Sequence, residues 1–108
     1  MKRGDIYMVD LEPTKGHEQK GRRPVVVVSP TSFNTITKLP VVLPITNGGG
    51  FAARNNFAVD ISGITITGRV LCNQPRTLDI SARGGVRVDT LPAETLNDLL
   101  ARLRTLFE

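Results

Sequence analysis

The sequence predicts a small, strongly bent antiparallel β-barrel followed by one C-terminal helix, that is, a mainly β fold. Short β-branched runs separated by Gly and Pro recur along the first 80 residues, and the last segment changes to a helical period. A length of 108 residues with 40% apolar content suits one hydrophobic core, so we expect a single domain over residues 1–108. The helix can then cover an open side of the barrel.

The first expected strands lie on either side of a charged loop. Ile6 to Leu11 is strand-like and is ended by Pro13. Val25 to Ser29 is a continuous β-branched run, which suits a strand buried on both faces. Val41 to Thr46 has the same character, although Pro44 within it indicates an edge position or a bulge.

The second half of the chain is expected to add short strands and then the helix. Phe57 to Ile61 and Ile64 to Cys72 predict two or three more strands, and Thr77 to Ile80 a short one. The helix is expected over Pro92 to Phe107, because Pro suits a first helical turn. Its apolar stripe, at i, i+3, i+4, i+7 and i+11, consists of Leu96, Leu99, Leu100, Leu103 and Phe107.

Composition narrows the function classes. Fourteen Lys and Arg against ten Asp and Glu give a net charge of +4, which makes a polyanion the candidate partner, with a merely solvated basic surface as the alternative. No apolar run approaches the roughly 20 residues of a membrane span, and no signal peptide is evident, so we expect a soluble, cytoplasmic protein. A lone Cys72 and a lone His17 argue against a disulfide framework and a zinc site, and no metal or cofactor is expected.

A polar, titratable loop from Gly16 to Pro24 stands directly before a buried strand, where binding and catalytic groups collect. Arg23, whose backbone is restricted by the following proline, suits a phosphate contact, and the alternative is a surface arginine paired with Glu18. His17 is either a solvated side chain or the ready proton carrier of the chain, with an unperturbed pKa of about 6.5. Glu18 could likewise accept a proton or hold the arginine.

Two later segments offer further groups. Thr46 ends a strand, so its hydroxyl either reaches toward the first loop or caps the strand end. The three glycines at 48–50 predict a flexible turn and lack the Lys-Ser/Thr continuation of a P-loop, which argues against nucleotide hydrolysis. Phe51 and Phe57 flank the segment 54–56 in an expected hairpin that suits stacking on single-stranded RNA, with one of the two phenylalanines in the core.

Five short motifs follow one another along the chain. They are Arg3-Gly4-Asp5-Ile6-Tyr7, Pro13-Thr14-Lys15-Gly16-His17-Glu18-Gln19, Arg23-Pro24-Val25, Pro44-Ile45-Thr46 and Gln74-Pro75-Arg76-Thr77-Leu78-Asp79. In this order and at this spacing they resemble the MazF/PemK/Kid family of toxin endoribonucleases, with the Kid/PemK branch nearest, over essentially the whole chain.

The resemblance implies an SH3-like barrel of the MazF/Kid/CcdB type that forms a homodimer. It further implies metal-independent cleavage of single-stranded mRNA at short sequences, in which the 2′-hydroxyl attacks the adjacent phosphate and leaves a 2′,3′-cyclic phosphate and a 5′-hydroxyl. The implied partner is a bacterial antitoxin with a flexible acidic C-terminal tail, and operator DNA would be bound only through that antitoxin. Cleavage would inhibit translation and growth.

The resemblance also assigns residues, with one departure. Arg23, Thr46 and His17 match catalytic positions, whereas Leu71 and Asn73 stand where some members carry an Arg and an Asp as acid and base. Because neither side chain can transfer a proton, that role is expected to fall to His17, Glu18 or water. Arg69, on the same strand face as Leu71, becomes a substitute phosphate contact. The expected substrate-binding residues are Glu18, Gln19, Arg22, Asn47, Arg54, Phe57, Arg69, Asn73 and Gln74.

A second hypothesis is a non-catalytic toxin of the same fold that acts by protein contact, like the gyrase poison CcdB. The absent Arg and Asp favour it. The match of His17, Arg23 and Thr46 favours the nuclease, because contact with gyrase requires none of them.

Overall fold

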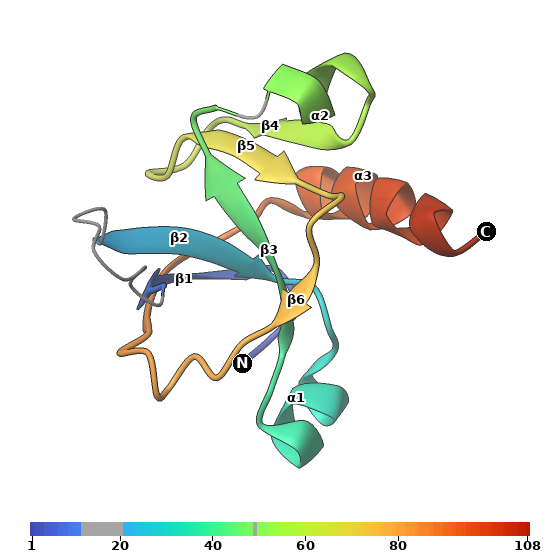
Figure 1. Cartoon of the computed structure of the whole chain (residues 1–108). Coiled ribbons are helices and arrows are strands. Elements are labelled where there is room, and N and C mark those ends of the chain that lie inside the picture. The colour runs from blue at the N-terminus through green and yellow to red at the C-terminus, as the bar shows by residue number, and fades with distance from the viewer. Residues whose placement is uncertain (12–20, 49) are drawn as a thin grey trace, which may run out of the picture.

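The computed structural model describes residues 1–11, 21–48 and 50–108. Within them, seven strands form one antiparallel sheet in the order β4-β5-β3-β2-β1-β7, with β6 paired to β3 (Figure 1). The strands are β1 Asp5–Asp10, β2 Arg22–Val27, β3 Val41–Thr46, β4 Ala58–Ile61, β5 Gly68–Leu71, β6 Arg76–Thr77 and β7 Val86–Thr90. The helices are α1 Thr31–Thr37, α2 Gly50–Arg54 and α3 Ala93–Arg104, and a 3-10 turn, Thr105–Phe107, follows α3. The predicted mainly β fold with a C-terminal helix is confirmed.

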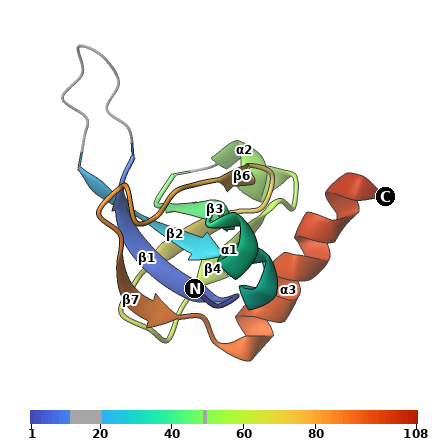
Figure 2. The same cartoon turned by 90° about the horizontal axis from the view of Figure 1, so that it is seen from below.

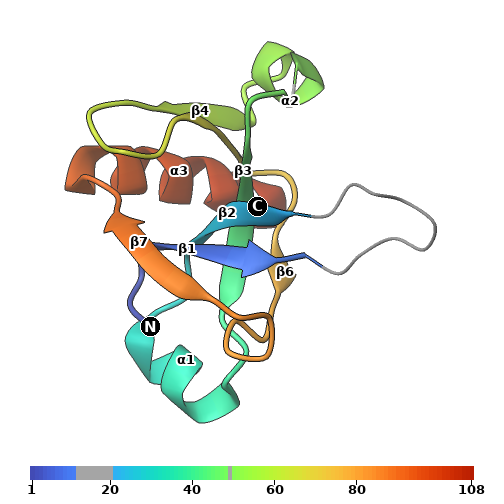
Figure 3. The same ribbon diagram turned by 90° about the vertical axis from the view of Figure 1, so that its left-hand side faces the viewer.

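The sheet bends at β3, which changes partner along its length. Val41 and Val42 pair with β6, whereas Ile45 and Thr46 pair with β5. Pro44 lies between these two pairings, where neither strand needs its missing N–H, and so a proline is tolerated in a central strand. The edge position expected from this proline is therefore wrong. In the strand order given above, which covers the described residues, β4 and β7 are the two edge strands. The sheet is strongly bent but is not a closed barrel (Figure 3).

Alternate residues of β2 and β3 feed two apolar clusters on opposite faces of the sheet. Val26 and Leu43 belong to the first cluster, together with four leucines of the predicted stripe. α3, which carries these leucines, lies along this side of the sheet (Figure 2). Val25 and Val42 belong to the second cluster, on the face away from α3. The expected burial of β2 on both faces is confirmed. Phe107, the last member of the predicted stripe, is 77% exposed and does not join the core.

Several predicted bounds change. β3 has the expected bounds, whereas β1 lies one residue earlier than expected, at Asp5–Asp10. β2 is Arg22–Val27 instead of 25–29, and β4 begins at Ala58. Of the predicted strands within 64–72, only Gly68–Leu71 forms, and the short strand lies at Arg76–Thr77 instead of 77–80. Pro92 is the N-cap of α3, not part of it.

Three elements, α1, α2 and β7, are not expected from the sequence. α1 has the sequence TSFNTIT, whose β-branched residues disfavour a helix. It is held by the buried Asn34, whose side-chain amide donates to the carbonyl oxygens of Met1 at 2.9 Å and Ser29 at 3.0 Å.

Among the described residues, no helix is long and apolar enough to cross a bilayer.

Candidate active site

Arg23 and Thr46 line one pocket at the end of the β2–β3 pair. The last pair of these two strands is Val25 with Pro44, and Arg23 and Thr46 each lie two residues beyond it. Side chains two residues apart in a strand project from the same face, which here is the face of Val25 and Val42, away from α3. The pocket has a volume of about 450 Å³ and is also lined by Leu11, Pro24, Pro44, Ile45, Leu71 and Gln74.

The hydroxyl of Thr46 is already oriented. Its Oγ1 accepts a hydrogen bond from the Gly48 N–H at 3.1 Å, so Thr46 does cap the end of its strand. That bond uses an oxygen lone pair and leaves the hydroxyl hydrogen free to donate. The capping role and a ligand-binding role are therefore compatible.

The pairing continues across β5 and β4 and forms a row of polar side chains. Thr46 faces Arg69, and Arg69 faces Asp60. The Arg69 Nε lies 3.2 Å from Asp60 Oδ1, and the two side chains are 38% and 79% exposed. Since strands are about 4.8 Å apart, the backbones of Arg23 and Arg69 lie about 10 Å apart on either side of Thr46. We call the four residues Arg23, Thr46, Arg69 and Asp60 the polar row.

The end of β5 completes the wall of the pocket. Leu71 is buried and lines it, and the exposed Gln74 lines both this pocket and an adjoining one of about 320 Å³. The Asn73 side-chain oxygen is buried and has no hydrogen-bond partner among the described residues. Leu71, which lines the pocket, and Asn73, which follows two residues later, cannot accept a proton.

The segment that was expected to be a hairpin is a helix and a tight turn. α2 ends in a Schellman motif: Phe57 N–H donates to the Ala52 carbonyl at 2.8 Å, and Asn56, with a φ of 65°, occupies the left-handed position. Phe51 is 62% exposed, whereas Phe57 is half-buried. The Arg54 guanidinium folds back over the glycine at residue 50.

The remaining predicted residues divide into three groups. Asn47 is exposed just after Thr46. Arg22 is engaged elsewhere, because its guanidinium donates to the carbonyl oxygens of Met8 at 2.9 Å and Gly84 at 2.6 Å and pairs with Asp10 at 3.4 Å. The residues His17, Glu18 and Gln19 lie outside the described residues, and with them the expected contact between Glu18 and Arg23.

The groups that line the pocket suit the binding of an anion, but none of the described ones is an acid or a base near neutral pH. The described residues that line the pocket include a guanidinium and a hydroxyl but no carboxylate or histidine. Burial raises the pKa of the Cys72 thiol to about 11, against the opposing charge of Arg102, so the thiol stays protonated near neutral pH. In the described ranges no three His, Cys, Asp or Glu side chains are grouped to hold a metal. The pocket can bind a phosphodiester and stabilise charge on it.

Sequence reasoning missed Asp60. Its position between Val59 and Ile61, which are both buried, signals an outward-facing residue in a strand. The identity of its neighbour follows only from the β4–β5 register.

Comparisons with known proteins identify the family and the fold of the chain. The sequence profile of the family described as "PemK-like, MazF-like toxin of type II toxin-antitoxin system" matches residues 2–107. The chain is 52% identical to endoribonuclease PemK of Escherichia coli over 98% of this chain and 81% of the relative, and 38% identical to endoribonuclease toxin ChpB of E. coli K12 over 98% and 93%. The crystal structure of MazE-MazF (Form-II) from Deinococcus radiodurans superimposes with a TM-score of 0.85 at 30% identity, over 98% of this chain and 94% of the other.

Proposed function

The chain belongs to the PemK-like, MazF-like toxin family of type II toxin-antitoxin systems and is an endoribonuclease, and we propose that it cleaves single-stranded mRNA at the pocket shared by Arg23 and Thr46. The observation that carries this site is their shared pocket, where a cation and an oriented hydroxyl converge.

In the proposed reaction the ribose 2′-oxygen forms a bond to the adjacent phosphorus while the bond from phosphorus to the 5′-oxygen breaks. A proton leaves the 2′-hydroxyl and another reaches the departing 5′-oxygen, so the products are a 2′,3′-cyclic phosphate and a 5′-hydroxyl. Negative charge grows on the non-bridging oxygens. The Arg23 guanidinium can grip two of these oxygens, and the free hydroxyl hydrogen of Thr46 can donate to one.

Arg69 extends the site to a neighbouring phosphate. Its guanidinium stands on the far side of Thr46 from Arg23, on the same face of the sheet. A strand of RNA that crosses β2, β3 and β5 would meet the two cations in turn. The ion pair with Asp60 is exposed, so a phosphate can compete for Arg69 at small cost.

Further contacts are proposed on both sides of the pocket. Gln74 lines the pocket, and Asn47, Arg54, Phe57 and Asn73, together with Glu18 and Gln19 of the first loop, are proposed to contact RNA beyond it. We keep Arg22 in a supporting role, since its three contacts tie β2 to β1 and to the carbonyl of Gly84. Proton transfer is assigned to His17, with Glu18 or water as the alternatives, because Leu71 and Asn73 cannot provide it.

Partners follow from family and charge. We propose that the toxin forms a homodimer in the bacterial cytoplasm and is neutralised by an antitoxin whose acidic tail occupies the basic RNA-binding surface, with operator DNA bound only through the antitoxin. A net charge of +4 and the structural likeness to a MazE-MazF complex support this proposal.

The test is cleavage of a mixed-sequence RNA by metal-free protein in EDTA, with both new ends mapped chemically. We expect a 2′,3′-cyclic phosphate and a 5′-hydroxyl, and no cleavage where the attacking ribose is replaced by deoxyribose. Thr46→Val should be impaired and Thr46→Ser active, because serine keeps the hydroxyl. If the RNA stays intact although the protein is folded, the proposed nuclease activity is wrong, and a toxin that acts by protein contact becomes the favoured hypothesis.

A further inference from the structure

We propose that Arg102, on the helix α3, is a positioning residue that holds the corner of the site formed by residues 55–57 after α2 and 72–74 after β5. This inference rests on the proposed function, since it concerns how Phe57, Asn73 and Gln74 are presented to RNA. Arg102 itself lies on the face of the sheet opposite the polar row, so it acts through these segments and does not touch substrate.

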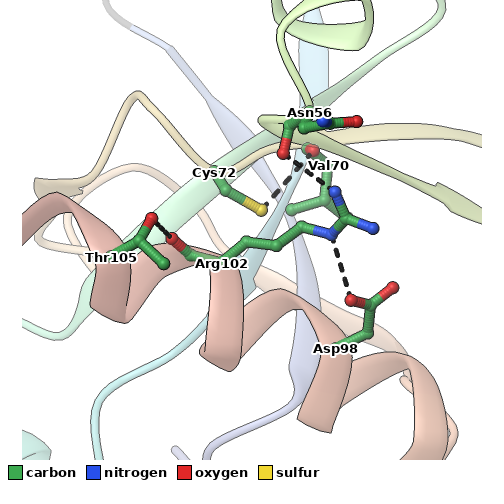
Figure 4. Close-up of polar contacts among 6 residues, drawn as sticks. All are labelled: Asn56, Val70, Cys72, Asp98, Arg102 and Thr105. Carbon is green, nitrogen blue, oxygen red and sulfur yellow. Dashed lines mark hydrogen bonds and ion pairs between the residues drawn. The ribbon is translucent and has the colours of Figure 1, made fainter.

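The contact is a two-pronged one, made by a single guanidinium. Arg102 Nη1 donates to the main-chain carbonyl of Asn56 at 2.8 Å, while its Nε donates to Asp98 Oδ1 at 3.0 Å one turn earlier in α3 (Figure 4). The planar fork is fixed by the carboxylate on one side and therefore presents its other donor in a defined direction. The side chains of Arg102 and Asp98 are 35% and 48% exposed, so the directed geometry of the fork, and not exclusion of water, defines this contact.

Asn56, which accepts the hydrogen bond from Arg102, has an unusual backbone conformation. Its φ of 65° is left-handed, a conformation that an asparagine tolerates and that closes the Schellman motif of α2. Only Ala52 of α2 is buried, so this helix has little apolar contact of its own to hold it. The charged hydrogen bond from Arg102 fastens α2 at its C-terminal end.

Backbone hydrogen bonds connect the turn that Arg102 contacts to the segment after β5. Phe57, the next residue, accepts a hydrogen bond at its carbonyl from the Cys72 N–H at 2.7 Å, and its own N–H donates to Ala52 at 2.8 Å. Cys72 directly precedes Asn73 and Gln74. Arg102 thus connects α3, through Asn56 and Phe57, to the segment 72–74, of which Gln74 lines the pocket.

The experiment compares Arg102→Met, which keeps the aliphatic stem, with Arg102→Lys and with Arg104→Met as the matched control in the same helical turn. Amide hydrogen exchange and steady-state cleavage of an RNA oligonucleotide are measured for each full-length protein. In Arg102→Met we expect exchange of the Phe57 and Cys72 amides to accelerate about tenfold or more, with kcat/KM lowered about tenfold and the Val26 amide in the core unchanged. Arg102→Lys, which can still donate to the Asn56 carbonyl, should recover most of both losses.

Three outcomes would overturn the proposal. The first is unchanged exchange in Arg102→Met. The second is faster exchange with unaltered kcat/KM, which would make the tether structural only. The third is an equal effect of Arg104→Met. If the parent protein failed to cleave RNA at all, the proposed function would fall, while the exchange data would still decide whether Arg102 holds the corner.

Discussion

Gly68 lies directly against the backbone of Thr46. A Cβ placed on Gly68 would stand 2.8 Å from the Thr46 carbonyl oxygen and 3.2 Å from the Ile45 Cγ2, and the φ of Gly68 is +131°. β5 can approach the site end of β3 this closely because residue 68 has no side chain. The position of the Thr46 hydroxyl therefore depends on a glycine that makes no contact with substrate in the proposed site.

Gly68→Ala is expected to push β5 away from Thr46. We predict a loss of about 1–3 kcal/mol in the free energy of unfolding and at least about a tenfold fall in kcat/KM. Urea unfolding and RNA cleavage measure the two. Gly63→Ala is the matched control, since Gly63 also has a positive φ, of +82°, but no atom within 4 Å of the added methyl group. Equal effects of the two variants on cleavage would show that the contact with Thr46 is unimportant.

Asp60→Asn is expected to strengthen RNA binding. The substitution keeps the side-chain shape but removes the negative charge that occupies Arg69 at 3.2 Å. Arg69 is then free to neutralise a phosphate, so the slope of log K against log salt should steepen by up to about 0.7 for a single strand. Fluorescence anisotropy with a non-cleavable 2′-deoxy oligonucleotide measures it, and the free energy of unfolding should change by less than about 1 kcal/mol because the pair is exposed.

Glu94→Gln serves as the control for Asp60→Asn, because it makes the same change of net charge in the first turn of α3. A comparable gain in that variant would mean that overall charge, and not release of Arg69, strengthens binding. Arg69→Gln combined with Asp60→Asn should abolish the gain.

Local sequence patterns predicted the elements whose signals are local. β3 was predicted with its observed bounds from a β-branched run, and α3 was predicted to within one residue at its start from an apolar stripe and Pro92. α1 could not be found in this way. Its residues disfavour a helix, and it exists because Asn34 bonds to Ser29 and Met1, which no periodicity reveals.

The site was predictable in part for a similar reason. Arg23 and Thr46 were chosen from motifs and the strand ends that carry them, and they share a pocket. The neighbours of Arg69 depend on the β3–β5 and β4–β5 registers, and a shift of one residue would turn Asp60 to the other face. The turn after α2, where a hairpin was expected, also accepts a hydrogen bond from Arg102 of α3, a long-range contact that local patterns do not reveal.

Arg22 and Arg23 are adjacent, but their replacement is expected to affect different properties: stability for Arg22 and catalysis for Arg23. Arg23→Ala should lower kcat/KM about 100-fold or more, the cost of one preorganised charge-stabilising donor, with little change in stability. Arg22→Ala should chiefly lower the free energy of unfolding, because its guanidinium bonds to the carbonyls of Met8 and Gly84. Arg23→Lys should be intermediate, since an ammonium cannot grip two oxygens in a fork. Normal cleavage by Arg23→Ala would remove this residue from the mechanism.

The pH dependence of cleavage is expected to report His17, the single histidine of the chain. Leu71 and Asn73 do not titrate, and the pKa of Cys72 is raised to about 11, so its thiol is protonated throughout pH 5–8. The imidazole must be neutral to accept the 2′-hydroxyl proton, and so kcat should rise with pH between about 5 and 8 if His17 is the base, and fall over that range if His17 is the acid. His17→Gln should flatten the profile between pH 5 and 8, whereas Cys72→Ala should leave it unchanged. A His17→Gln profile of the parental shape would instead assign proton transfer to Glu18 or to water.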